Sequence, residues 1–270
     1  MYKDYYHFKE NPFNITADPD FFYKSSRHKE ALAHLIYGIN QRKGIVVLTG
    51  EIGTGKTTLL RTVLNALDAS TKTAFILNPA FSEVQLLRLI LKDLGIESTA
   101  KNKVALVERL NGFLLAETSQ GHNVVLIIDE AQNLGVKQLE QVRLLSNLET
   151  EKEKLLQIVL VGQPELMAKL KLESLRQINQ RVSVRYHLTP LDKAEMQAYI
   201  QHRMQVAKGG KDNHPVTFTP EAVDKIYEIS GGTPRMVNIL CDRALLAGFS
   251  LETHTLDKEI IESSAQEVAP

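Results

Sequence analysis

The stretch GEIGTGKTT, at residues 50–58, is the feature that most constrains how this chain folds. It lies between the apolar runs IVVL and LLRTVL, which are predicted to form a strand and a helix. The spacing G-x-x-x-x-G-K-T, in this context, is typical of a phosphate-binding loop, or P-loop. Glycines let successive backbone N–H groups turn toward an anion, and a helix that begins near Lys56 directs its positive end to the same place.

This stretch predicts a nucleotide site with a magnesium ion. Lys56 would add a positive charge on the outer phosphates, and the Thr57 hydroxyl would ligate Mg²⁺. The alternative is a strand-to-helix turn with glycines by chance, and a chance match in a chain this long is on the order of 1%. The predicted binding residues are Gly50, Glu51, Ile52, Gly53, Thr54, Gly55, Lys56, Thr57 and Thr58.

Composition is that of a globular protein with enough chain for two domains. The 270 residues are 43% hydrophobic and 24% charged, with a formal net charge of zero. The single cysteine, Cys241, excludes an internal disulfide and suits a reducing compartment. The N-terminus has no apolar core of a signal peptide, and no apolar run reaches the ~18–20 residues of a membrane span. We therefore expect a cytoplasmic protein.

Apolar runs alternate with helical patterns over the first 189 residues. This alternation predicts a doubly wound α/β domain with a parallel five-stranded sheet. The run NVVLIIDE is nearly all apolar, as expected of a central strand covered on both faces. The expected strands are 45–49, 73–78, 123–130, 155–162 and 182–188.

The pattern changes at Pro190, after which we expect helices with no strand between them. These helices fit residues 192–207, 220–230, 234–248 and 256–267. The predicted domains are therefore an α/β P-loop domain over 1–189, including an aromatic-rich N-terminal arm, and a small all-helical domain over 190–270. The second domain carries 8 Lys/Arg against 12 Asp/Glu, so it is acidic.

The third predicted strand ends in two carboxylates, Asp129 and Glu130. Beside a P-loop, the first carboxylate would hold the Mg²⁺ shell, often through water. The second would orient and deprotonate the attacking water. The alternative for Glu130 is a solvated loop carboxylate.

Four motifs occur in an order that resembles the AAA+ ATPases: GEIGTGKTT, LIIDEAQ, VGQPEL and GGTPR. The N-terminal block NPFNITADPDFFYKSSRHKEALAHLIYGI, together with VGQPEL, resembles the AAA+ ATPases of the general secretion pathway protein A (ExeA/GspA) type. This resemblance covers essentially the whole chain. It implies an α/β ATPase domain with a small helical lid, and Mg²⁺-dependent hydrolysis of ATP to ADP and phosphate.

The resemblance also implies roles for single residues. Gln163 falls at the sensor-1 position, where a polar side chain contacts the γ-phosphate or the attacking water, although many AAA+ proteins have Asn, Asp, Ser or Thr there. Arg235 resembles sensor 2, a lid arginine that reaches the phosphates. Arg181 matches the arginine finger, with Arg176 as its rival. The alternatives are a turn residue at Gln163 and solvated arginines at the other positions.

Partners and location are likewise implied by the resemblance alone. Such ATPases serve bacterial envelope secretion, pilus or export machines, work with a membrane-protein partner and form nucleotide-dependent homo-oligomers. Longer members continue into a membrane-spanning helix and a periplasmic peptidoglycan-binding domain. We therefore expect a cytoplasmic module that is free-standing or tethered at the inner membrane through a partner or a missing C-terminal segment.

Two other functions stay open. One is a DNA-linked AAA+ ATPase, such as a transposition regulator, but the sequence has no defensible helix-turn-helix pattern and no dense Lys/Arg stripe, and its last 81 residues are acidic. The other is a slow nucleotide-dependent switch that acts through conformation, which the presence of both carboxylates disfavours. ATP is inferred from the resemblance, because no guanine-reading N-K-x-D motif is present.

Overall fold

The computed structural model describes residues 1–79, 81–208 and 216–267. These residues form two compact units. The unit that we call the sheet unit comprises His28–Ile52 and Leu60–Leu188. The unit that we call the helical unit comprises Met1–Arg27, Gly53–Leu59 and the described residues from Thr189 onward.

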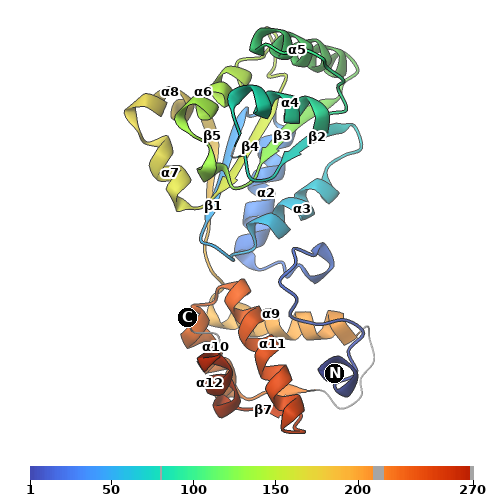
Figure 1. Ribbon diagram of the computed structural model, residues 1–270, viewed down its shortest axis with the longest axis vertical. Coiled ribbons are helices and arrows are strands. Elements are labelled where there is room, and N and C mark those ends of the chain that lie inside the picture. Colours follow the sequence, from blue (N-terminus) through green and yellow to red (C-terminus); the bar gives the residue numbers. More distant parts are fainter. Residues whose placement is uncertain (80, 209–215, 268–270) are drawn as a thin grey trace. The chain divides into compact units, whose positions relative to one another are not determined.

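The sheet unit is built on one five-stranded sheet in the order β2-β3-β4-β1-β5, with every neighbouring pair parallel (Figure 1). This confirms the predicted fold class. The strands are β1 (Ile45–Gly50), β2 (Thr71–Ile76), β3 (Asn123–Ile128), β4 (Gln157–Gly162) and β5 (Val182–Leu188).

Burial along the strands explains this order. All six residues of β1 and of β4 are buried, and so are the last five of β3, which matches central strands covered on both faces. The edge strands β2 and β5 instead mix buried, intermediate and exposed positions. The most continuous apolar runs therefore take the centre of the sheet.

Helices connect the strands, and several begin where the sequence predicts. Ser82 caps α4 in a capping box with Gln85, and Pro164 occupies the first turn of α7. The helices are α2 (Ser26–Asn40), α3 (Lys56–Ala66), α4 (Glu83–Asp93), α5 (Lys103–Ser119), α6 (Val136–Leu145), α7 (Pro164–Leu170) and α8 (Arg176–Arg181), with single 3₁₀ turns η2 (Ala131–Asn133) and η3 (Glu173–Leu175).

Parallel pairing brings the carboxyl ends of three strands together. Because β4 lies between β3 and β1 and pairs in parallel with both, the last residues of the three strands lie at the same edge of the sheet. These residues are Gly50, Ile128 and Gly162. Ligands of open parallel sheets bind outside this edge. The P-loop begins here.

The helical unit contains α9 (Lys193–Lys208), α10 (Pro220–Ser230), α11 (Pro234–Ser250) and α12 (Lys258–Gln266). Thr219 caps α10 by accepting the Ala222 N–H, and Gly231 ends that helix in the left-handed conformation at φ 55°. These four helices match the predicted ones closely.

Two short strands in this unit were not expected. β6 (Thr217–Phe218) pairs in parallel with β7 (Thr255–Leu256), so the prediction of no strand beyond Pro190 is wrong in this detail. Strands of two residues are too short to show an alternating pattern in the sequence.

The N-terminal arm is not part of the sheet unit, although the sequence-based domain division grouped it with the α/β domain. Its elements, α1 (Tyr2–Tyr5) and η1 (Pro19–Phe21), belong to the helical unit. The rings of Tyr6, Phe8 and Phe13 lie in the apolar core of that unit. A small helical unit has little core of its own, and aromatic rings add large apolar area to it.

A buried arginine ties the arm to the helices. Arg203 on α9 is 5% exposed. Its guanidinium donates to the carbonyls of Pro12 (2.5 Å) and Asn14 (3.1 Å) and to the Tyr199 hydroxyl (2.9 Å). Tyr199 in turn donates to Asn238 Oδ1 at 2.8 Å, and desolvation by burial raises the pKa of the Tyr199 phenol above its usual 10.0, so it stays a neutral donor.

We expect Arg203→Met to loosen the arm. The variant would remove the donor to the Pro12 carbonyl and to the buried Tyr199 hydroxyl, and one of the two donors to the Asn14 carbonyl, at a cost on the order of 3 kcal/mol. Urea unfolding followed by circular dichroism, with limited proteolysis of the arm, would measure this effect. The control is Arg243→Met, since Arg243 has a side chain 48% exposed. Equal midpoints for the two variants would show that the Arg203 network contributes nothing.

Candidate functional site

The P-loop has the backbone conformation that its glycines allow. β1 ends at Gly50, and α3 begins at Lys56. Gly53 and Gly55 between them take φ values of +81° and +94°, a region that favours glycine. Turns of this kind point consecutive N–H groups into an anion-binding concavity.

The residues present fit a nucleotide with a magnesium ion. Lys56 is only 7% exposed, at the first position of an 11-residue helix whose positive end favours anions. Within the described ranges no group of three or more His, Cys, Asp and Glu could hold a metal ion. Mg²⁺ does not need such a group, because it is usually held by one or two protein oxygens, substrate phosphates and water. Thr57 and Asp129 are residues of that type.

Glu130 lies directly beyond β3 and is held in a strained turn. Its φ of 53° and ψ of 37° are left-handed, which is uncommon for a non-glycine residue and is often found at functional sites. Its backbone N–H donates to Asp129 Oδ1 at 2.9 Å. Asp129 itself is 2% exposed. Because β3 ends at Ile128, both carboxylates follow it at the carboxyl edge of the sheet.

Gln163 meets Glu130 at this edge. Gln163 follows β4, and its Nε2 lies 3.5 Å from Glu130 Oε2. The structure thus brings together two residues that are 33 positions apart in the sequence. Their contact is the feature of the sheet unit that most closely matches the predicted site.

Gln132 is a residue of this site that the sequence did not reveal. Its Nε2 donates to Glu130 Oε2 at 2.5 Å, and its Oε1 accepts the Gln163 N–H at 3.0 Å. A Cβ on Gly162 would lie 2.7 Å from that Oε1, so glycine leaves the room that Gln132 occupies. The sequence contains Gln132 as the last residue of LIIDEAQ, but matching this motif alone assigns no role to that residue.

Arg235 lies near the P-loop within the helical unit. It is the second residue of α11, and its backbone N–H donates to the Gly53 carbonyl at 3.1 Å. A Cβ on Gly53 would come 2.6 Å from Arg235 Cβ, so only glycine permits this approach. The Arg235 side chain is exposed.

Arg181 lies at the opposite edge of the sheet unit. It directly precedes β5, whose Val182 pairs with Ile45 at the start of β1. The length of β1, roughly 16 Å, separates this edge from the one that holds Glu130 and Gln163. Arg181 is therefore not brought together with these two residues.

The immediate surroundings of Arg181 and its rival are also defined. The Glu149 carboxyl has a lowered pKa because of its hydrogen bond and attraction to Lys154, with a smaller contribution from Arg181. Arg176 pairs with Glu173 at 3.6 Å, and 68% of its side chain is exposed. Neither arginine is buried.

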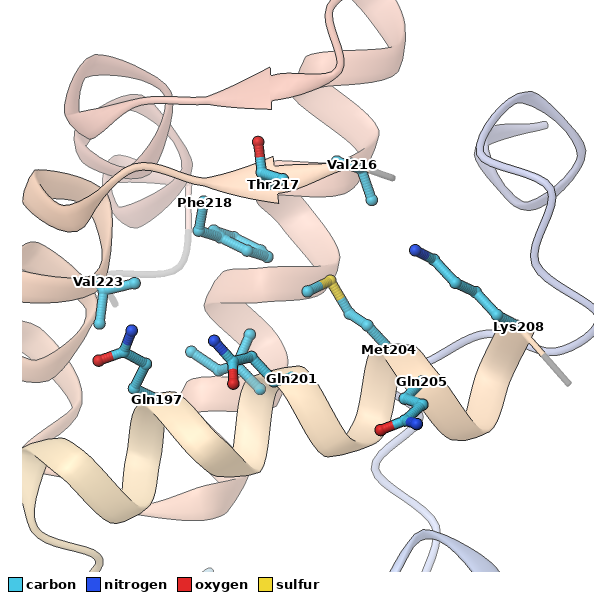
Figure 2. Close-up of a pocket in the computed structure, with 10 residues that line it drawn as sticks. Gln197, Gln201, Met204, Gln205, Lys208, Val216, Thr217, Phe218 and Val223 are labelled. Atoms are coloured by element: carbon cyan, nitrogen blue, oxygen red, sulfur yellow. The ribbon is translucent and has the colours of Figure 1, made fainter. Parts of the chain in front are cut away.

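A cavity of about 330 Å³ in the helical unit has no predicted site residue in its wall (Figure 2). Gln197, Gln201 and Met204 of α9 line it together with Phe218 of β6 and Val223 of α10. Its wall combines apolar and amide side chains with Thr217 and Lys208, and it lacks the glycines and carboxylates of the predicted site. We therefore keep it separate from the candidate nucleotide site.

The strand order, the P-loop after β1 and the carboxylates after β3 define the AAA+ class of P-loop proteins. Residues 39–170 match a protein-family model described as an AAA domain. Solved structures share the fold at low sequence identity. The Aeropyrum pernix ORC2 protein, solved as ADPNP-ADP complexes, superposes with a TM-score of 0.71 at 14% identity, over 96% of this chain and 72% of that one.

Two further structures support the same fold. Cdc6p from Pyrobaculum aerophilum gives a TM-score of 0.69 at 19% identity, over 93% of this chain and 71% of that one. The Thermotoga maritima RuvB Holliday junction branch migration motor gives 0.56 at 18% identity, over 92% and 72%.

A relative identified by sequence is more specific. The chain is 44% identical over 271 residues to the general secretion pathway protein A of Aeromonas hydrophila, which confirms the predicted resemblance. It is an AAA-type protein related to that secretion protein. The match covers 100% of this chain and 49% of the relative, so the chain spans about half of the relative's length. Among the described residues, no helix has both the length and the apolar character needed to cross a membrane.

We expect Lys56→Ala to weaken ATP binding by roughly 10–100-fold, because a charge-assisted contact of 1.5–3 kcal/mol is lost. Isothermal titration with Mg²⁺–ATP would measure the change, and Lys72→Ala, an exposed lysine on β2, is the matched control. Unchanged affinity in Lys56→Ala would contradict the P-loop assignment.

Proposed function

We propose that this chain binds ATP with Mg²⁺ and hydrolyses it to ADP and phosphate. The observation that carries the proposal is the contact of Glu130 with Gln163 at the sheet edge where the P-loop begins. A carboxylate next to a polar amide, beyond the ends of parallel strands, is suited to orienting a water molecule. The match of residues 39–170 to an AAA domain and the similarity to a secretion pathway protein support the same activity.

Each site residue then has a role. Residues 50–58 cradle the phosphates through their N–H groups, with Lys56 neutralising the outer charge. Thr57 and Asp129 would hold Mg²⁺, which would supply neutralisation of the phosphate charge. Glu130 takes a proton from the attacking water, and Gln163 orients that water molecule.

The remaining two roles concern arginines. Arg235, whose backbone contacts Gly53, reaches the phosphates as sensor 2 from a helical lid that begins near residue 190. Arg181 acts as an arginine finger for a neighbouring copy. This assignment agrees with its position at the amino edge of the sheet, remote from its own Glu130. Nucleotide binding would therefore favour assembly of a homo-oligomer.

The biological setting that we propose follows the relative's name. A secretion-pathway ATPase of this type would power or regulate assembly of an envelope machine from the cytoplasmic side, with a membrane-protein partner that tethers it at the inner membrane. A DNA-linked role is less favoured, because the chain beyond residue 189 is acidic. A slow switch would retain binding without turnover.

Glu130→Gln separates hydrolysis from binding. We expect the variant to bind ATP like the wild type and to release phosphate roughly 10²–10⁴-fold more slowly, the usual effect of a lost general base. A coupled phosphate-release assay would measure it, and Glu165→Gln on the exposed face of α7 is the control. Wild-type turnover in Glu130→Gln would make Glu130 a solvated loop carboxylate.

Mixing two inactive variants tests the arginine finger. Arg181→Ala keeps its own P-loop but cannot serve a neighbour, whereas Lys56→Ala binds ATP poorly but still offers its arginine. We expect each alone to be slow, since a finger contributes about 10³–10⁵ in rate. The mixture should regain part of the activity under conditions in which the wild type assembles. Full activity of Arg181→Ala alone under those conditions would remove this assignment and direct the test to Arg176.

A further inference from the structure

Gln132 connects the two strand ends that carry the proposed chemistry. It lies in η2, two residues beyond Glu130, and its side chain spans from the turn after β3 to the start of α7 after β4. Both ends of its amide are used, because Nε2 donates to Glu130 and Oε1 accepts from the backbone of Gln163. A single side chain thus fixes the position of one residue relative to the other.

The space around Gln132 is shaped for this arrangement. Gly162 has no Cβ, and a Cβ there would lie 2.7 Å from Gln132 Oε1 and 3.2 Å from its backbone nitrogen. The Lys169 ammonium donates to the Gln132 carbonyl at 2.5 Å and to the Leu134 carbonyl at 2.7 Å, which anchors the backbone of η2 from α7. Gln132 is therefore held from both its backbone and its side chain.

We propose that Gln132 is a positioning residue for hydrolysis, which sets the orientation of the Glu130 carboxylate and couples it to Gln163. This role rests on the proposed ATPase activity. Glu130 Oε2 is fixed by the Gln132 amide and by the weaker 3.5 Å contact from Gln163. A carboxylate that is already oriented loses little freedom when the transition state forms, and a misplacement near 1 Å can cost about 10²-fold in rate.

Two substitutions separate the contributions of the two Gln132 side-chain hydrogen bonds, one to Glu130 and one from the Gln163 N–H. Gln132→Met removes both hydrogen bonds at nearly constant length. Gln132→Glu keeps an oxygen that can accept the Gln163 N–H but replaces the donor to Glu130 with a second carboxylate. Gln138→Met is the matched control, because Gln138 lies on the following helix α6 and its Nε2 donates to the Phe81 carbonyl instead.

Steady-state phosphate release and hydrogen exchange of the Gln163 amide are measured on all four proteins. We expect kcat to fall by about 10-fold or more in both Gln132 variants with KM for ATP unchanged. The backbone N–H of Gln163 should exchange about 10-fold faster in Gln132→Met, which is the effect of one lost hydrogen bond. In Gln132→Glu it should exchange at the wild-type rate. The control should match the wild type in both measurements.

Several outcomes would overturn the inference. A kcat of wild-type size or larger in both Gln132 variants contradicts a positioning role, and unchanged exchange in Gln132→Met contradicts the contact itself. If the wild type releases no phosphate, the proposed ATPase function fails, and the positioning role fails with it. Faster exchange in Gln132→Met would then still establish the contact, so the two failures are distinguishable.

Discussion

Parallel pairing of β3, β4 and β1 is the constraint on which the candidate site depends. Three strands that run the same way in adjacent positions end at one edge, so the residues that follow each strand become neighbours there. This register makes Glu130 and Gln163 partners although they are remote in sequence. It equally places Arg181, which directly precedes β5, at the opposite edge of the sheet from Glu130 and Gln163.

Glycines and one strained residue give the candidate site residues their local backbone conformations. Gly53 and Gly55 supply left-handed backbone where a side chain would be costly, and Gly162 leaves room for the Gln132 amide. Glu130 takes a left-handed conformation without being glycine. Such strain persists only where surrounding contacts hold it, and the hydrogen bond from the Glu130 N–H to Asp129 Oδ1 is a contact of that kind.

The sequence predicted what local patterns encode. The central strands are continuous apolar runs, and the P-loop and the Asp129-Glu130 pair are recognisable by residue type and spacing. The position of the N-terminal arm was not predictable. Its aromatic residues indicate that the arm is buried, but they do not indicate which unit of the protein it packs against. The role of Gln132 depends on which strands are neighbours, and the two-residue strands β6 and β7 are too short to leave a periodic pattern.

We propose that the sheet edge beyond β1, β3 and β4 hydrolyses ATP in assembled copies of the chain. The most direct measurement is phosphate release by the wild-type protein with Mg²⁺–ATP over a wide range of protein concentration. We expect a specific activity that rises with protein concentration, reaches a plateau and is abolished by EDTA. Phosphate release that is absent at every concentration, or that continues unchanged in EDTA, would contradict it.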